Sequence, residues 1–274
     1  MPAPKKPTLK PDFATFGGIA LAVGGILGGL LLEKGSIMDI AQFTAALIVV
    51  GGTAGALLVT TPFESLKLGF SHCKLIFFEN RYVPASLIEE MINYCMKARS
   101  KGTTSLELDA ANTKDPFLRK ALNMAADGHS VAEVKTTMDL EIDTADQRFE
   151  EAAKVFDSAG GYAPTVGIIG AVLGLIQVMK NLGDISLVGH GIAVAFVATI
   201  YGVGIANLLL LPAAGKIRAR ARAECERKEL LLNGIVGIME GVNPRVLRSR
   251  LNAYLQESQQ KKTGARVGSA ARAA

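Results

Sequence analysis

The chain has 274 residues, of which 49% are hydrophobic and 20% are charged, with 29 glycines, no tryptophan and a formal net charge of +5. A mean hydropathy of +0.29 in so charged a chain requires apolar and charged residues to lie in separate segments. This separation excludes an ordinary soluble domain and a disordered chain, and it indicates a polytopic membrane protein.

Four segments are long and apolar enough to cross a hydrocarbon core of about 30 Å as single helices. They are predicted at residues 13–32, 40–62, 161–182 and 187–212. Lysines before the first segment also fit a secretory signal peptide, but its apolar run is too long and no small-residue cleavage site precedes Glu33. We therefore expect an all-α polytopic membrane protein with four transmembrane helices.

The positions of the 30 Lys and Arg residues predict the orientation of these spans. All except Lys34 and Lys180 lie before the first span, between the second and third, or after the fourth. The positive-inside rule places those regions and both termini in the cytoplasm, and leaves two short outside connections at 33–39 and 183–186. The cytoplasmic segments are then residues 1–12, a large helical loop at 63–160, a helical region at 213–257 and a disordered tail at 258–274. The net charge therefore reflects topology and does not indicate nucleic-acid binding.

Helix signals divide the cytoplasmic segments. Pro84 and Pro116 each open a predicted amphipathic helix of the large loop. Ser130 and Glu133 form a capping-box pattern for one long helix that feeds the third span. After the fourth span, residues 216–232 are expected to continue its helix into the cytoplasm.

The sequence carries no motif of catalysis or metal binding. Cys73, Cys95 and Cys225 lack CxxC spacing and a neighbouring His in a ligand pattern, so they are interpreted as free thiols. There is no Gly-rich phosphate loop and no nucleophile elbow. We expect neither an enzyme nor a cofactor or metal site.

The predicted spans contain pairs of glycines four residues apart. These pairs are Gly24/Gly28, Gly25/Gly29, Gly51/Gly55 and Gly170/Gly174. Such small-xxx-small pairs let helix backbones approach closely and gain van der Waals contact that lipid does not offer. We expect close helix packing, for any one pair more often within a subunit than between subunits, and an oligomer.

No Asp, Glu, Lys or Arg lies near the midpoint of any predicted span. A proton path at membrane depth normally requires an ionisable group, because a hydroxyl such as that of Thr199 cannot take up and release a proton near neutral pH. If the chain conducts protons, the carboxylate must come from a partner chain. His190, at the start of the fourth span, is expected to be an interfacial residue.

Two prolines of the spans and one charged segment of the large loop can be interpreted from position and charge alone. Pro164 lies about three residues into the third span and Pro212 ends the fourth, as expected for helix punctuation. A compact charged segment follows the first loop helix and contains Lys97, Arg99, Lys101, Glu107 and Asp109. It is interpreted as a solvated surface, with steering of a charged partner as the alternative.

The segments YAPTVGIIGAVLGL at 162–175 and GIAVAFVATIYG at 191–202 closely resemble the MotA/PomA family of flagellar stator proteins. The resemblance extends over nearly the whole chain to about Leu255, including the order of two spans, large loop and two spans. It implies an ion-driven torque generator of the bacterial inner membrane, with a pentamer of this chain around a dimer of a MotB-like partner. The partner would supply the ion-binding Asp and grip peptidoglycan.

The resemblance also assigns roles to residues of the charged segment. In the family, an Arg followed eight residues later by a Glu contacts the rotor protein FliG. Arg99 and Glu107 have this spacing, and Lys101 lies between them. Carried over to this chain, the three become the candidates for rotor contact.

A second set of roles concerns the ion path. The two functional prolines of the family match Pro164 and Pro212, which implies conformational coupling at both. Sodium-driven relatives carry Thr where this chain has Ala171, and Thr-Thr where it has Ala198-Thr199. Because a dehydrated sodium ion needs several oxygen ligands, the missing hydroxyls favour protons. Ion-path and partner-helix contacts are therefore expected at Pro164, Ala171, Ala198 and Thr199.

Two rival interpretations are open to the same sequence. A TolQ/ExbB-like proton-channel subunit shares the small-residue third span, but such relatives have three spans and an outside N-terminus, which the Lys and Arg distribution contradicts. A solute carrier should show repeated halves and broken helices, whereas the two hairpins of this chain differ and no duplicated segment is visible. The stator interpretation is therefore preferred.

Overall fold

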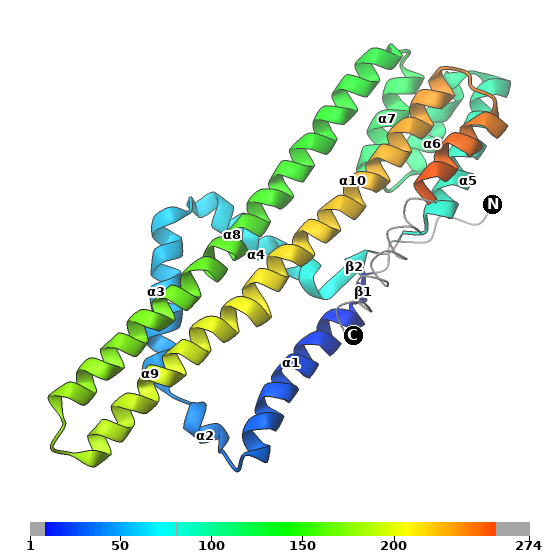
Figure 1. The fold of residues 1–274 in the computed structure, drawn as a ribbon. Coiled ribbons are helices and arrows are strands. Elements are labelled where there is room, and N and C mark those ends of the chain that lie inside the picture. The colour runs from blue at the N-terminus through cyan, green and yellow to red at the C-terminus, as the bar shows by residue number, and fades with distance from the viewer. Residues whose placement is uncertain (1–8, 81, 256–274) are drawn as a thin grey trace. The chain divides into compact units, whose positions relative to one another are not determined.

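The computed structural model describes residues 9–80 and 82–255, so the tail expected at 258–274 and most of the segment 1–12 lie outside the described residues. The described chain is almost entirely helical, with four helices long and apolar enough to cross a membrane (Figure 1). This confirms the predicted all-α fold class. The chain divides into two compact units, which we call the span unit (Met1–Asn80 and Arg148–Ala221) and the loop unit (Arg81–Gln147 and Arg222–Ala274).

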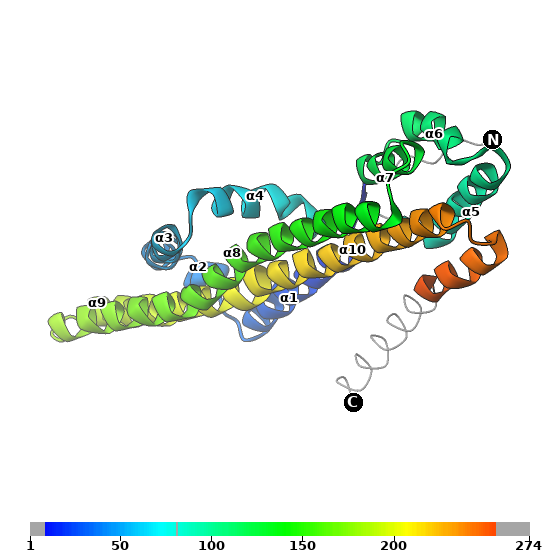
Figure 2. The same cartoon turned by 90° about the horizontal axis from the view of Figure 1, so that it is seen from above.

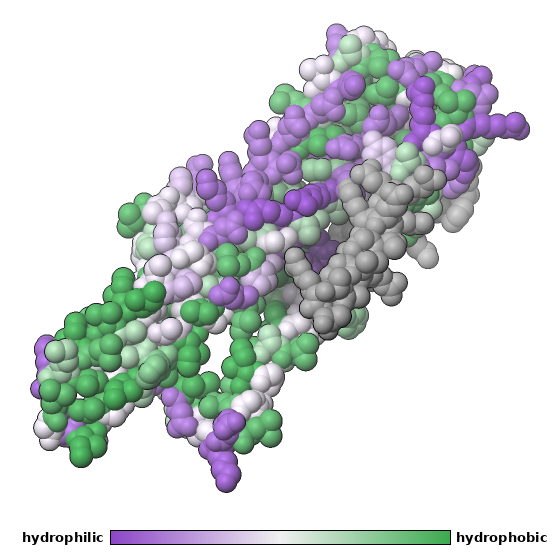
Figure 3. All heavy atoms as spheres, in the orientation of Figure 1, coloured by the Kyte–Doolittle hydropathy of each residue, from purple (hydrophilic) through white to green (hydrophobic). Residues whose placement is uncertain are grey.

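The span unit contains the apolar helices. Its elements up to the loop are β1 (Leu9–Pro11), α1 (Phe13–Leu32), α2 (Ile37–Ile40), α3 (Phe43–Thr60), α4 (Phe63–Phe77) and β2 (Phe78–Asn80). It continues with the second part of α8 (Val131–Lys180), α9 (Ile185–Ile205), a π-helical segment η2 (Ala206–Leu210) and the first part of α10 (Leu211–Met239). Figures 1 and 2 both show α9 running beside the end of α8, and Figure 3 shows an apolar surface over these helices.

The loop unit is a bundle of shorter helices together with parts of α8 and α10. Its own elements are α5 (Pro84–Lys101), η1 (Thr103–Leu106), α6 (Glu107–Asn112), α7 (Pro116–Ala126) and a helix at 244–255. Local signals set where these helices begin. The Asp115 side chain caps α7 by accepting from the Phe117 N–H at 3.0 Å. At the start of α8, the Ser130 N–H donates to Glu133 Oε2 at 2.9 Å and the Glu133 N–H to Ser130 Oγ at 3.2 Å, as a capping box requires.

Helices α8 and α9 pack backbone to backbone through small residues. A Cβ built on Gly174 would lie 2.7 Å from the Gly191 carbonyl oxygen, and one on Gly202 would lie 2.6 Å from the Ala163 carbonyl oxygen. The Gly170/Gly174 pair therefore packs within one subunit. On α1 the situation is opposite, because a Cβ on any of its glycines would meet no atom of the described residues within 4 Å, and no residue of α1 is buried.

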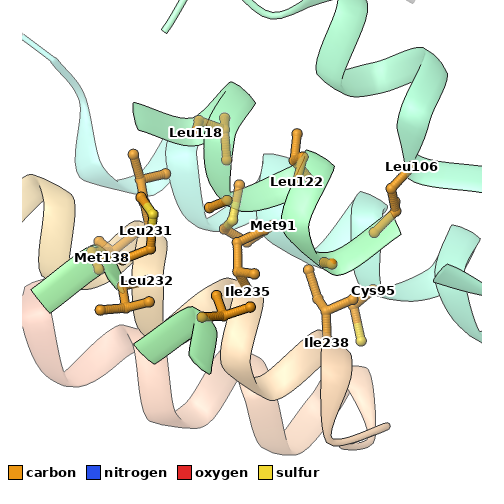
Figure 4. Close-up of a cluster of buried hydrophobic side chains, with 14 of the residues drawn as sticks. Met91, Cys95, Leu106, Leu118, Leu122, Met138, Leu231, Leu232, Ile235 and Ile238 are labelled. Atoms are coloured by element: carbon orange, nitrogen blue, oxygen red, sulfur yellow. The ribbon is translucent and has the colours of Figure 1, made fainter. Parts of the chain in front are cut away.

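The loop unit has a core of large side chains. Figure 4 shows Met91 and Cys95 of α5, Leu118 and Leu122 of α7, Met138 of α8 and four residues of α10 converging in one cluster. Phe117 and Leu106 are also almost completely buried. Burial of such side chains contributes about 1.5–3 kcal/mol each. This core fixes the short helices that carry the charged segment.

The two prolines do not punctuate helices, contrary to the interpretation by position alone. Pro164 lies in the interior of the 50-residue helix α8, and Pro212 lies just after the start of α10 in a helical run that continues without interruption from α9. A proline cannot donate to the carbonyl four residues earlier, so each position lacks one helical hydrogen bond. The π-helical turn η2 ends at Leu210, two residues before Pro212, so a departure from regular α-helical hydrogen bonding lies next to this proline.

Four elements of the structure that were not expected from the sequence are α4, β1, β2 and α6. Helix α4 follows α3 almost directly, and it packs Ile76 with Ala152 of α8 and Ile217 of α10 in a second small core. The strands β1 and β2 pair antiparallel, although only three residues of each take part. Helix α6 has six residues, too few to show a helical period in the sequence.

Candidate functional site

The charged loop, which we define as residues 97–109, runs from the end of α5 through η1 to the start of α6. Its turn is made by Gly102, whose φ of 81° suits glycine and whose N–H donates to the Ala98 carbonyl at 2.8 Å. The Ser105 hydroxyl then donates to the Gly102 carbonyl at 2.7 Å. Leu106 and Ala110 are fully buried and attach the far side of the loop to the core. The loop is therefore a short, fixed connection.

The structure sorts the five charged residues of this loop into two groups. Lys97 donates from Nζ to Asp109 Oδ2 at 2.6 Å, and both side chains are partly buried. Arg99, Lys101 and Glu107 are exposed and form no ion pair with any other described residue. The three residues assigned to rotor contact by resemblance are thus the three whose charges remain open to a partner.

Residues beneath the loop join it to the core of the loop unit. The Tyr94 hydroxyl donates to Glu90 Oε1 at 2.6 Å, and Cys95 donates from Sγ to the Val242 carbonyl at 3.4 Å. Burial, followed by the hydrogen bond to Glu90 and the negative charges of Glu90 and Asp109, raises the pKa of Tyr94 far above its usual value. Tyr94 is therefore a neutral hydroxyl at physiological pH and a stable hydrogen-bond donor under the loop.

The residues expected along the ion path occupy two kinds of position on α8 and α9. Ala198 is fully buried, and it packs with Ala45 and Val49 of α3. Pro164, Ala171 and Thr199 are partly exposed, and the Thr199 hydroxyl donates to the Ala195 carbonyl at 3.2 Å. Of the expected set, these three could face a partner helix, whereas Ala198 is enclosed by this chain.

Neither helix supplies a carboxylate, a lysine or an arginine along its apolar length. No Asp, Glu, Lys or Arg occurs in α9, and none occurs in α8 between Asp157 and Lys180. His190 is exposed near the start of α9. Beside Pro164 and Thr199 the polar groups are a hydroxyl and backbone carbonyls, which can orient a proton carrier but cannot themselves bind and release the proton.

A buried ionic cluster near the start of α1 was missed by sequence reasoning. Asp12 caps α1, and its carboxylate receives Arg220 Nη2 at 2.6 Å and the Lys216 ammonium. Arg220 also reaches Glu79 at 2.9 Å. Although burial opposes ionisation, the hydrogen bond and charge of Lys216 and the charge of Arg220 lower the pKa of Asp12. The only sequence signal was an Asp directly before an apolar run, a common N-cap.

A second ionic cluster joins α8 to α10 within the span unit. Arg218 donates from Nε to Glu150 Oε2 at 2.8 Å and also contacts Asp157. Both carboxylates raise the pKa of this guanidinium, which stays charged. Asp157 and Arg218 lie about two turns from Pro164 and Pro212 along their helices, so this cluster holds the two helices together close to both prolines.

These features define a class: a multi-pass helical membrane protein with a tightly packed small-residue helix pair and a separate charged loop. A family model described as the MotA/TolQ/ExbB proton channel family matches residues 109–230. Motility protein A of Bacillus subtilis is 32% identical over 87% of this chain and 88% of its own length. Chemotaxis protein PomA of Vibrio alginolyticus is 30% identical over 90% of this chain and 96% of its own length.

The solved structures agree with the sequence comparisons. The flagellar MotAB stator complex of Bacillus subtilis contains a chain that matches with a TM-score of 0.84 and 31% identity, over 92% of this chain and 99% of that chain. The chain belongs to the MotA/PomA family of flagellar motor stator proteins. The comparisons favour this family over the TolQ/ExbB alternative, since these two relatives, named for motility and chemotaxis, each match over most of the chain.

Proposed function

We propose that this stator subunit assembles with a MotB-like partner and couples proton flow to torque on the rotor protein FliG. The observation that best supports this is that α9 and the apolar part of α8 contain no Asp, Glu, Lys or Arg, since a proton path at membrane depth needs an ionisable group there and His190 lies near the start of α9. The similar solved chain comes from a complex named MotAB. A partner carboxylate would complete the path, and the work done is mechanical rather than enzymatic.

The proposed location is the bacterial inner membrane, with both termini and the loop unit in the cytoplasm. The distribution of Lys and Arg supports this orientation, because only Lys34 and Lys180 lie near the two outer connections. The partner would hold the assembly to peptidoglycan outside the membrane. Torque could then act on the rotor without the stator being carried round.

For the ion path, we place the partner helix against Pro164, Ala171 and Thr199, the partly exposed members of the expected set. Protonation would remove the charge of the partner carboxylate and change its contacts with Pro164 and Thr199. A pentamer of this chain around a partner dimer would then turn stepwise, with Pro164 and Pro212 transmitting the change. Ala198, which is enclosed between helices, would act through close packing.

The choice of proton over sodium rests on Ala171 and Ala198, which place methyl groups where sodium-driven relatives carry hydroxyls. The test is the swimming speed of a stator-deficient strain that expresses this chain with its partner, in sodium and then in potassium medium. Equal rescue in both supports protons. Rescue in sodium alone would keep the motor function and reverse the ion, and absence of rescue despite normal membrane insertion would contradict the stator assignment.

The rotor contact is tested separately at the charged loop. Glu107→Lys and Arg99→Glu should each abolish most motility, because they reverse charges that are exposed and unpaired among the described residues. The amount of the chain in the membrane should stay the same. Loss of insertion instead would assign these residues a structural role.

A further inference from the structure

Lys97 and Asp109, which form an ion pair, flank in the sequence the residues assigned to rotor contact. Lys97 precedes Arg99 by one intervening residue on α5, and Asp109 follows Glu107 by one intervening residue on α6. We propose that Lys97 and Asp109 are positioning residues that decide which charges the loop presents to the rotor protein. This inference rests on the proposed rotor contact of Arg99 and Glu107.

The geometry of the pair links the two ends of the loop. Lys97 Nζ and Asp109 Oδ2 are 2.6 Å apart, and their side chains are 31% and 25% exposed. Each belongs to a different helix, so the contact fixes the end of α5 against the start of α6. The neighbouring Ala98 and Ala110 are buried, so both ends of the pair are next to residues anchored in the core.

The pair also changes the charge pattern of the surface. Lys97 and Asp109 neutralise one another, so the charges left to a partner are those of Arg99, Lys101 and Glu107. If Asp109 were neutral, the free Lys97 ammonium would add a third cation beside Arg99. If Lys97 were neutral, the free Asp109 carboxylate would add an anion beside Glu107. Either change alters complementarity to a charged partner without removing a contact residue.

The pair is only partly buried, so its loss should not unfold the loop unit. Partly exposed ion pairs add little to stability, whereas the large side chains beneath the loop are fully buried. A defect in Lys97 or Asp109 variants would therefore reflect the geometry and charge of the loop. This separates a positioning role from a structural one.

The experiment measures torque per stator unit from the speed steps of a bead on a rotating flagellum, with the full chain and its partner. Lys97→Met and Asp109→Asn should each lower this torque by about twofold or more. Lys97→Asp combined with Asp109→Lys should restore most of it, because the exchanged pair keeps both the link and the neutralisation. Membrane content, proton conductance and the thermal midpoint of the complex should not change.

Lys120→Met is the matched control, since Lys120 pairs with Glu141 at 2.8 Å in the same unit outside the charged loop. It should leave torque at the wild-type level. An equal loss in this control would overturn the inference, as would unchanged torque in both single variants or failure of the exchanged pair to restore it.

The two proposals fail in different ways. If Glu107→Lys and Arg99→Glu leave torque unchanged, the rotor contact itself is wrong. If they abolish torque while Lys97→Met and Asp109→Asn do not lower it, the contact stands and the positioning role is rejected.

Discussion

The span unit and the loop unit are each stabilised internally by a different kind of contact. Where α8 meets α9, the contacts are backbone atoms of Gly167, Gly174 and Gly202 against those of the facing helix. In the loop unit, the contacts are large apolar side chains such as Phe117, Met91 and Ile235.

The solvent explains this difference. In water, burial of apolar surface drives folding, so large side chains give the largest gain. In lipid, the surroundings are as apolar as the side chains, and helices gain by approaching closely enough for backbone contact. The loop unit should therefore be destabilised by truncating a buried side chain, and the α8–α9 contact of the span unit by adding a methyl group.

The largest effect is expected from Phe117→Ala in the loop unit. Phe117 is 1% exposed, and the truncation leaves a cavity that should cost about 4 kcal/mol of local stability. Hydrogen exchange of the loop unit in the assembled complex would measure this loss. Leu140→Ala, at a residue 65% exposed, is the control and should change little. Equal effects in the two variants would mean that burial does not hold this unit.

The second-largest effect is expected from adding a methyl group to the α8–α9 contact of the span unit. Gly202→Ala adds one methyl group that would lie 2.6 Å from the Ala163 carbonyl oxygen, so the helices must separate at a cost of about 3 kcal/mol. Gly204→Ala, on the same helix with nothing within 4 Å, should be neutral. Thermal unfolding of the detergent-solubilised complex compares the two, and a stable Gly202→Ala variant would refute close backbone packing there.

A smaller effect is expected from the charges at the edge of the span unit. Asp12→Asn keeps the cap of α1 but leaves Lys216 without its carboxylate partner, at a cost of about 2 kcal/mol. Because the folded pKa of Asp12 is lowered, its stabilisation is complete above about pH 4 and is lost as pH falls through the folded pKa. Unfolding midpoints measured against pH should show this acid loss in the wild type and not in the variant.

The smallest effect concerns the capping box at the start of α8. Ser130→Ala removes the hydroxyl that accepts from the Glu133 N–H and should cost about 1 kcal/mol. Hydrogen exchange in the first turn of α8 should rise, and exchange near the α8–α9 contact should not. A Ser130→Asp variant, which can still cap, should retain protection. Faster exchange along all of α8 would show that the cap controls more than one end of the helix.

Much of this fold follows from sequence patterns that carry their own physical cause. Uncharged runs such as the one preceding Lys180 must lie in lipid, and Ser130 with Glu133 marks a helix start whatever lies beyond it. The loop helices at Pro84 and Pro116 were predictable for the same reason. These are local signals, and the structure places a helix at each.

Other features depend on contacts between distant residues and could not be read from the chain. The sequence offers three cations and two anions in the charged loop, but only the path of the chain from α5 through η1 to α6 brings Lys97 and Asp109 together. Likewise Gly28 and Gly174 belong to the same sequence pattern, yet among the described residues only Gly174 of this pair lies against another helix. Asp12 and Arg220 form their pair across a long separation in sequence.

The π-helical turn η2 has a consequence for the geometry of the last long helix. A π-helical turn inserts one residue into the α-helical repeat, and each residue of an α-helix turns the chain by about 100°. The part of α10 that belongs to the span unit is therefore rotated by roughly that angle relative to a regular helix that begins in α9. A side-chain pattern of period 3.6 is shifted by one residue at this turn. The part of α10 that follows therefore presents a different face from the one that a regular continuation of α9 would present.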